Sequence, residues 1–240
     1  MAGYGGTSGV VRDGLVFGVD AADKNSYPGR ITDWDDIVGS SHGDLIGGGG
    51  PTYSSNNNGY YTFDGNDDEI DFTAHKWTAY ADNFTIEFWC KPTTTHEIDT
   101  QSNSSTTGTS GQKYMWYPYH ASSNSGIGIS LGTNGISIYE HGDSYMPPIA
   151  VWSGTVSSAL FSHVVITYTA KQGRIYLNGV LEHTGLTSTK STVWLGMQQA
   201  GEMGYGDWAG DIALIRAYNR PLTLAEIQSN FNAHRHRFGI

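Results

Sequence analysis

Cysteine is almost absent from this sequence, whose 240 residues contain a single one, Cys90. One cysteine cannot form an intramolecular disulfide, so a small disulfide-stapled scaffold is excluded. Cys90 ends an alternating run in register with Phe84, Ile86 and Phe88. We therefore expect a small buried thiol at this position, and not a reactive nucleophile.

Basic residues and long apolar runs are also scarce. Lys and Arg number 13 against 23 Asp and Glu, a formal charge of −10 at pH 7. Proteins that bind the phosphate backbone show the opposite balance, so nucleic acid is not an expected partner. No apolar stretch approaches the length of a membrane span, and residues 1–9 lack the features of a signal peptide. We expect a protein made in a cytoplasm without Sec-type export and without a membrane partner.

Glycine and aromatic residues, in contrast, are abundant: 32 Gly, 15 Tyr and 7 Trp. These residue types favour strands and turns over helices. About twelve strand candidates are separated by turn signals, and no repeat or linker divides them. The pattern predicts one all-β domain over residues 14–240, a two-sheet antiparallel sandwich. A flexible Gly-rich arm is expected over residues 1–13.

Turn and loop signals locate several boundaries. The segment 132–135 contains Asn-Gly, which supplies the positive φ angles of a hairpin, and Asn178-Gly179 predicts another turn. Residues 92–112 are rich in Thr, Ser, Gly and Asn and are too polar to bury. We expect them to form a long exposed loop.

The last segment predicts the only helix. Thr223 is suited to the N-cap, and Glu226 three residues later completes a capping box. Leu222 and Ile227 form the hydrophobic staple across the cap. Three apolar residues at helical spacing are expected to pack on the sandwich: Leu224, Ile227 and Phe231.

Four pieces of the sequence are specific in combination although each alone is weak. They are an opening strand at 14–22, an FDGxxDxI turn at 63–70, core strands at 84–89, 163–168 and 175–179, and a closing strand at 210–222. Together they resemble the laminin-G-like jelly roll of the concanavalin A-like lectin/glucanase superfamily. The resemblance covers residues 14–233 and implies a jelly-roll sandwich with one short C-terminal helix. Residues 26–29 and 230–240 also resemble segments of tailed-phage virion proteins, which lysis would release without a signal peptide.

The resemblance implies a structural cation between the first and last strands. Ca²⁺ takes several oxygen ligands, usually carboxylates and backbone carbonyls. Asp211, at the start of the closing strand, matches the family's aspartate, and the nearest further ligands are Asp20, Asp64 and the Gly65 carbonyl. In the alternative interpretation, Asp211 only caps backbone N–H groups. The turn at 66–68 is a second candidate for the cation.

Aromatic residues beside polar loops are candidates for stacking on sugar rings. They are Tyr114, Trp116, Tyr119, Tyr205 and Trp208. Exposed rings beside polar side chains suit glycans, whereas rings of the same types often simply fill a core. Both interpretations stay open at this point.

Hydrolysis is a further possibility within this superfamily, whose laminarinase-type members carry Glu-Ile-Asp-x-x-Glu on one strand. Retaining hydrolysis uses two carboxyl groups about 5 Å apart. The segments 69–71 and 97–99 both read Glu-Ile-Asp, but neither is followed by the second glutamate. We therefore predict that the protein is not an enzyme.

The resemblance implies a non-enzymatic phage virion protein, a capsid decoration or tail component located in the virion. Its expected partners are other virion proteins or copies of itself, with host-surface polysaccharide as a further ligand. Candidate assembly contacts lie at the two ends of the chain: Tyr4, Arg235, Arg237 and Phe238. The alternative is a free bacterial carbohydrate-binding module or a laminarinase-like glycoside hydrolase.

Overall fold

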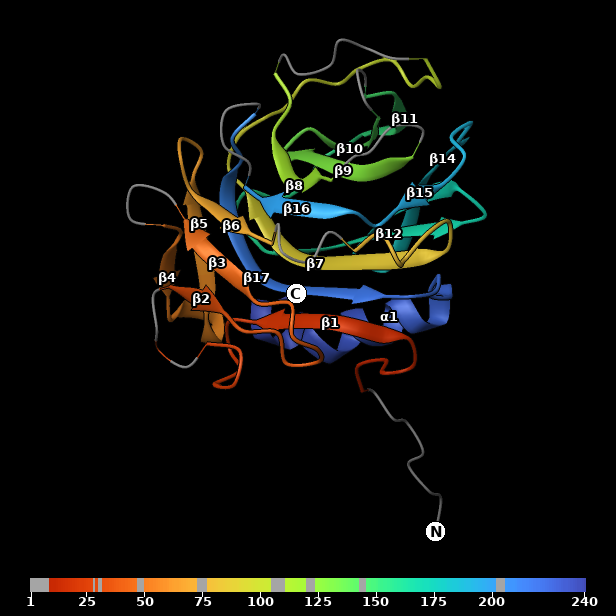
Figure 1. Ribbon diagram of the computed structural model, residues 1–240. Helices are drawn as coiled ribbons and strands as arrows, with labels where there is room; N and C mark the ends of the chain where they lie inside the picture. Colours follow the sequence, from red (N-terminus) through yellow and green to blue (C-terminus); the bar gives the residue numbers. More distant parts are fainter. Residues whose placement is uncertain are drawn as a thin grey trace.

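Two β-sheets stack into a sandwich, and one helix lies on an outer face (Figure 1). This computed structural model describes residues 9–27, 29, 32–46, 50–72, 77–104, 111–119, 124–142, 146–201 and 206–240. Within these residues every pairing but one is antiparallel, the exception being a two-residue strand. The predicted all-β jelly-roll sandwich with a short C-terminal helix is confirmed.

The first sheet has eight strands. In spatial order they are β14 (Val180–Thr187), β13 (Gln172–Leu177), β12 (Ser162–Thr169), β7 (Phe84–Pro92), β17 (Ala209–Tyr218), β5 (Tyr60–Asp64) and β4 (Thr52–Ser54), with β1 (Leu15–Asp20) paired to β17. The first half of β17 lies between β5 and β7, and its second half lies between β1 and β7. The closing strand is therefore interior to the sheet and lies beside the opening strand, as the resemblance implies.

The second sheet has nine strands, several of them very short. In spatial order they are β11 (Pro148–Ser153), β10 (Gly135–His141), β9 (Ser125–Gly132), β8 (Tyr114–Pro118), β16 (Met197–Ala200), β6 (Glu69–Asp71), β3 (Gly43–Ile46) and β2 (Asp33–Trp34), with β15 (Val193–Trp194) beside β9. Strands of two to four residues carry too little alternation to be recognised in the sequence. This is why the structure has more strands than we predicted.

The core between the sheets is built from aromatic and branched side chains. Phe88 packs edge-on against Trp116, with ring centroids 5.5 Å apart. Ile129 and Ile166 are fully buried in the same cluster. Cys90 is buried there too, which confirms the prediction of a small buried thiol, and burial raises the pKa of that thiol.

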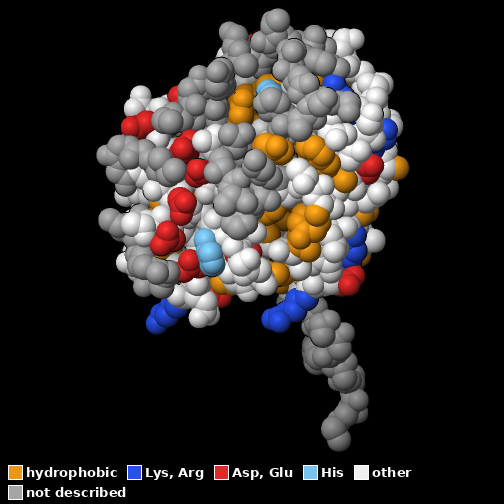
Figure 2. Space-filling view, in the orientation of Figure 1, with side chains coloured by type: hydrophobic (Ala, Val, Ile, Leu, Met, Phe, Trp, Pro, Cys, Tyr) orange, Lys and Arg blue, Asp and Glu red, His pale blue; other side chains and the backbone are white. Residues whose placement is uncertain are grey.

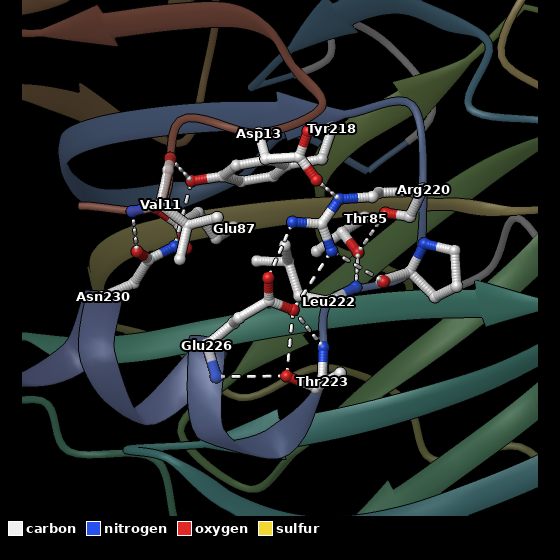
Figure 3. Close-up of polar contacts among 11 residues, drawn as sticks. Val11, Asp13, Thr85, Glu87, Tyr218, Arg220, Leu222, Thr223, Glu226 and Asn230 are labelled. Atoms are coloured by element: carbon white, nitrogen blue, oxygen red, sulfur yellow. Dashed lines mark hydrogen bonds and ion pairs between the residues drawn. The ribbon is translucent and has the colours of Figure 1, made fainter.

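Glu87 on β7 is completely buried on the other face of the first sheet, beneath the helix (Figure 3). Its carboxylate accepts from Arg216 Nη1 at 2.9 Å and from Asn230 Nδ2 at 2.7 Å, and His163 Nε2 lies 3.4 Å away. Burial raises the pKa of Glu87. The His163 hydrogen bond, the Arg216 charge and the Asn230 hydrogen bond outweigh burial and hold the pKa at about 2. Glu87 therefore stays ionised inside the protein.

Asn230 extends this network to the start of the described chain. Its Nδ2 also donates to the Tyr218 hydroxyl at 2.9 Å, while its Oδ1 accepts from Val11 N at 2.8 Å. The Tyr218 hydroxyl donates to Val11 O at 3.2 Å. The arm that we predicted to be flexible over residues 1–13 is thus anchored at Val11, and residues 1–8 lie outside the described residues.

The helix, α1 (Leu224–His234), starts as predicted. Thr223 and Glu226 form the full capping box, and Glu226 also binds Arg220 through two hydrogen bonds (Figure 3). The predicted face is wrong at Leu224, which is 47% exposed, whereas Asn230 is fully buried. The helix sits over polar groups as well as apolar ones, so its buried face is rotated away from Leu224. No helix in the described ranges is long and apolar enough to cross a membrane.

The two predicted turns are present, with one difference in backbone geometry. Asn178 and Gly179 have φ angles of 50° and 79°, as an Asn-Gly hairpin requires. Gly132 pairs with Gly135 across the other hairpin, but Asn134 is not among the residues with positive φ. Ala170 and Lys171, with φ angles of 47° and 65°, form a left-handed turn that their residue types do not indicate.

Replacing Asn230 by alanine should destabilise the protein by about 1–3 kcal/mol, because it leaves the buried Glu87 and Val11 groups short of a partner. Urea denaturation followed by circular dichroism measures this. The matched control on the same helix is Leu224→Ala, whose exposed side chain should cost within about 0.5 kcal/mol. Equal losses in the two variants would contradict the role given to the network.

Candidate functional site

A row of polar side chains crosses the outer face of the second sheet. Successive cross-strand partners, from β2 to β8, are Asp33, Asp44, Asp71, Gln199 and Tyr117. We call these five residues the polar row. The next positions along the strands include Leu45, Ile70 and Ala200, which belong to or pack against the core. Because successive residues of a strand point to opposite faces, the polar row faces away from the core.

Glu69 joins the row from the same face of β6, two residues before Asp71. It accepts a hydrogen bond from Gln199 Nε2 at 2.9 Å and is only 3% exposed. Burial raises the pKa of Glu69, and the negative charges of Asp71 and Asp207 raise it further, although the Gln199 bond lowers it. Glu69 is therefore easier to protonate than an exposed glutamate.

The row places like charges side by side. Asp44 lies directly opposite both Asp33 and Asp71. Like charges that lie directly opposite each other weaken the pairing of two strands. Acidic side chains gather on the side of the molecule that carries β2, β3 and β6 (Figure 2). Carboxylates and an amide in one line can accept hydrogen bonds from several hydroxyl groups of one ligand.

The other half of this outer face is covered by the segment after β7. His96 Nδ1 lies 2.9 Å from Ser130 Oγ on β9, and Asp99 accepts from the Tyr139 hydroxyl on β10 at 2.7 Å. Gln112 Nε2 donates to the same Asp99 oxygen at 2.9 Å. The predicted long exposed loop is wrong for His96 and Gln112, which are 5% and 1% exposed. Hydrogen bonds to Ser130 and Asp99 allow these two polar side chains to be buried.

Three of the predicted sugar-stacking rings are in the interior. Tyr114, Trp116 and Trp208 are fully buried, so the prediction is wrong for them. Their polar atoms are used inside the protein: Trp208 Nε1, for example, donates to Leu131 O at 2.9 Å. A bulge in β8 separates Tyr114 from Trp116, so that Trp116 enters the core while Tyr114 packs with Tyr117.

Two other predicted rings have different outcomes. Tyr119 is half-buried and stacks on Trp194, with centroids 6.2 Å apart. Tyr205 lies outside the described residues. Tyr117, the neighbour of the buried Trp116, is the aromatic residue that this segment contributes to the polar row.

The aspartates expected to share a cation are held by the protein's own cations. Asp211 binds Lys91 Nζ at 2.8 Å and accepts from Thr62 Oγ1 at 2.7 Å. Asp20 binds Arg237 Nη1 at 2.7 Å. Neither belongs to a group of metal-ligating side chains in the described ranges. The predicted pairing of Asp20 and Asp211 in one cation site is therefore wrong. Strand register places Asp211 opposite Lys91, and Arg237 of the C-terminal 3-10 helix reaches Asp20.

Asp64 instead meets Asp67 and Asp68, with carboxylate oxygens within 4.8 Å of one another. Asp68 accepts from Asp64 N at 2.9 Å, and Asp64 accepts from Asn66 N at 2.8 Å. Burial raises the pKa of Asp68, and the charges of Asp64 and Asp67 add to that effect, although the Asp64 backbone bond lowers the pKa. Three carboxylates in one turn supply the hard oxygen ligands that Ca²⁺ takes.

Gly65 gives this turn its shape. Its φ angle is 78°, and a Cβ there would lie 2.7 Å from that of Ala209. A larger residue would therefore force the turn away from β17. This is the physical reason for glycine in the FDGxxDxI segment that carries the resemblance.

The predicted assembly contacts in the C-terminal segment are used within the chain. Arg237 donates to the carbonyls of Asn57 and Gly59 as well as binding Asp20. Phe238 is buried against Trp89, with ring centroids 4.4 Å apart. These residues are thus structural, and their prediction as attachment points is wrong.

The remaining assembly candidates are Arg235 and Tyr4. Arg235 Nε donates to Ile240 O at 2.8 Å, which holds the last residue against the sandwich. The contact therefore also stays within the chain. Tyr4 lies outside the described residues.

The comparisons with known proteins agree with this architecture. A family model described as "Laminin_G_3: Concanavalin A-like lectin/glucanases superfamily" matches residues 64–228. No curated protein sequence is significantly similar to the chain.

Three solved structures share the fold at low sequence identity. Domain 4 of AbnA, a GH43 extracellular arabinanase from Geobacillus stearothermophilus in complex with arabinotriose, has TM-score 0.62 and 14% identity, with 90% of this chain and 97% of that one covered. A Trypanosoma rangeli sialidase has TM-score 0.60 and 14% identity, with 95% of this chain but 34% of that one covered. The binding domain of Paraclostridial Mosquitocidal Protein 1 has TM-score 0.59 and 15% identity, with coverages of 91% and 52%. The chain therefore spans nearly all of the arabinanase domain and about a third of the sialidase.

Calcium binding by the turn of Asp64, Asp67 and Asp68 stays a prediction. Adding Ca²⁺ should raise the melting temperature, because a ligand of the folded state alone stabilises that state. Differential scanning calorimetry with and without a chelator measures the shift. Asp67→Asn should reduce it, whereas Asp211→Asn should keep it. If only Asp211→Asn abolished the Ca²⁺-dependent rise in melting temperature, the cation would bind at Asp211 and not at the Asp64 turn.

Proposed function

Because the chain belongs to the concanavalin A-like lectin/glucanases superfamily, we propose that it is a non-enzymatic carbohydrate-binding protein. The observation that carries this proposal is the polar row on the outer face of the second sheet. The row combines several hydroxyl-binding side chains with the half-buried ring of Tyr117. This combination suits a glycan, which presents many hydroxyl groups around apolar ring faces.

Each part of the row has a chemical task in this proposal. Asp44 and Asp71 accept hydrogen bonds from sugar hydroxyls, while the amide of Gln199 can both donate and accept. Tyr117 closes one end of the row with an aromatic surface. All these residues lie on paired strands, so little side-chain and backbone ordering is required on binding.

The arabinanase domain supports the proposal because it was solved with arabinotriose and covers nearly the same length as this chain. The second supporting structure of this fold is described as the binding domain of the mosquitocidal protein. At sequence identities of 14% and 15%, the similarity shows a shared fold and does not identify which glycan this chain binds. The net charge of −10 favours a neutral glycan over a polyanionic one.

For the biological setting, we propose a phage particle, with the protein as a capsid decoration or tail component that adheres to host-surface polysaccharide. The support is the resemblance of residues 26–29 and 230–240 to virion proteins of tailed phages. Calcium at the Asp64 turn would stabilise the domain in this setting. Antibody labelling of purified particles tests the location, and labelling only of the unassembled fraction would contradict it.

Replacing Asp71 by asparagine together with Gln199 by alanine should weaken glycan binding at least about tenfold, since each lost hydrogen bond to a charged or amide group is worth about 1–2 kcal/mol. A glycan array identifies a binding sugar, and titration calorimetry then measures its affinity for each variant. Glu182→Gln on β14 of the first sheet is the control and should bind normally. Unchanged affinity in the double variant would refute the polar row as the site.

A hydrolase is the second candidate, and one observation favours it. Glu69 has a raised pKa and lies two positions from Asp71 on the same face of β6. A raised pKa is what a general acid requires, and Cα atoms two positions apart along a strand are separated by about 6.6 Å. Carboxyl groups about 5–5.5 Å apart serve retaining hydrolysis, and wider pairs serve inversion. The second glutamate of the laminarinase motif is still missing, so we rank binding first.

Hydrolysis is tested by incubating the protein with laminarin and measuring reducing ends. We expect no release above the buffer control. Release that persists through repurification and disappears in Glu69→Gln would replace the binding proposal by an enzymatic one. The matched variant is Glu97→Gln, because Glu97 begins the other Glu-Ile-Asp segment and lies outside the polar row.

A further inference from the structure

A pocket of about 470 Å³ opens on the side of the sandwich where both sheets end. It is lined by Ala21, Ala22, Lys24, Tyr27, Gly29 and Tyr53. Tyr53 belongs to β4, the last strand of the first sheet, and the other lining residues lie between β1 and β2, the last strand of the second sheet. Figure 1 places β4 and β2 on the same side of the molecule. The pocket is separate from the polar row, with which it shares no residue.

Two stacked tyrosines form the aromatic wall of this pocket. The rings of Tyr27 and Tyr53 lie 3.9 Å apart at an interplanar angle of 21°, and both residues are half-buried. Tyr61 contacts both rings edge-on, with centroid distances of 5.9 and 5.7 Å. Trp34 packs against Tyr61 from within the core, at 4.9 Å. The half-buried pair is therefore backed by buried rings and is ordered before any ligand arrives.

The same aromatic group contains polar atoms whose hydrogen bonding is incomplete. The Tyr61 hydroxyl and Trp34 Nε1 are buried and have no hydrogen-bond partner in the described part of the chain. Neither residue lines the pocket, so these two atoms belong to the layer behind the stacked tyrosines and do not face a ligand. The Tyr53 hydroxyl reaches Ala21 O at 3.4 Å, a long bond that leaves it able to turn to another partner. Exposed Lys24 adds a cationic donor at the rim.

The chemistry of this wall selects among ligands. Grooves that hold proline-rich peptides need a slot between aromatic rings, and rings stacked at 3.9 Å leave none. A purely apolar ligand would leave the polar rim unpaired. A sugar ring has an apolar face that packs on an aromatic surface and hydroxyl groups at its edge for tyrosine and lysine groups. The pocket volume lies within the range of small-molecule sites.

We propose that the Tyr27–Tyr53 pocket is a second carbohydrate site, which takes one or two sugar units. This inference rests on the proposed function only in assigning carbohydrate as the ligand class, because its residues are different. Two separate sites would let one domain hold two glycan chains, or two parts of one chain, with an avidity that neither site has alone.

The test is ¹⁹F NMR of the full chain labelled with 3-fluorotyrosine, with signals assigned from single Tyr→Phe variants. Arabinotriose, laminaritriose and sialyllactose are titrated separately, at concentrations high enough to detect binding with a Kd of about 1 mM. The signals of Tyr27 and Tyr53 report the pocket, and the signal of Tyr117 reports the polar row. Saturable shifts at Tyr27 and Tyr53 with any of the three sugars support the proposal.

The two sites can fail separately in this experiment. If the ¹⁹F signals of Tyr27 and Tyr53 do not shift with any of the three sugars, the proposed pocket site is wrong, whether or not the Tyr117 signal shifts. Silence of Tyr117 alone counts against the polar row and leaves the pocket intact. Decaproline is the competing probe: shifts with it and with no sugar would assign the pocket to a peptide and overturn the proposal.

Variants keep the result independent of folding. Tyr53→Ala should abolish the shift at Tyr27, but it also removes packing from β4. Ala22→Trp is the second variant, because it fills the pocket from an exposed lining position and removes no core ring. It should weaken the pocket's response at least about tenfold while the melting temperature stays close to that of the unmodified protein. A full response in the folded Ala22→Trp protein would contradict binding in this pocket.

Discussion

The rest of the structure depends on the hydrogen bonds and the ion pair of the buried Glu87 carboxylate. A buried charge is costly unless it is paired and hydrogen-bonded on several sides. Here the partners come from three places: Arg216 on β17, His163 on β12 and Asn230 on the helix. Since none of these groups can leave without exposing an unpaired charge in the interior, the strands and the helix must be in place together. The network thus couples the first sheet to the segment that covers it.

The same coupling explains why the outer faces of the two sheets differ. The first sheet is covered by α1 and by residues 235–240. Asn230 of this segment binds Glu87, and Arg237 binds Asp20. The second sheet is covered only in part, by the segment that packs on β9 and β10. The polar row lies beside this covered part, on the short strands β2, β3, β6 and β16 and on β8. The segment that packs on β9 and β10 therefore bounds the candidate site on one side.

Local signals in the sequence predicted local structure well. The capping box of Thr223 and Glu226 and the Asn178-Gly179 turn depend on neighbouring residues and were confirmed. The aromatic prediction failed because the burial of Trp116 and Trp208 depends on sheet stacking, which a residue type does not report. Leu224 failed for a related reason, because the helix turns its buried side toward a polar network that pattern analysis treats as surface.

The candidate site shows the same division. Alternation alone could have placed Asp44 and Asp71 on the face opposite Leu45 and Ile70, since each aspartate sits beside an apolar residue. Their alignment with Gln199 and Tyr117 requires the register of strands far apart in the chain. The stacked tyrosines are even harder to predict from the sequence, because Tyr27 lies in an irregular segment and contacts Tyr53 only in the folded protein. The superfamily was recognisable from short segments, whereas the sites depend on long-range pairing.

The position of β17 has a consequence for how the molecule is made. This strand is interior to the first sheet, yet it follows every other strand in the described part of the chain, and the Val11–Asn230 contact spans 219 residues. Until residues 209–218 leave the ribosome, β5 and β7 each present an unpaired edge to solvent. Such edges invite pairing with other nascent chains, and contacts this distant form slowly. The first sheet can therefore close only after its last strand has been made.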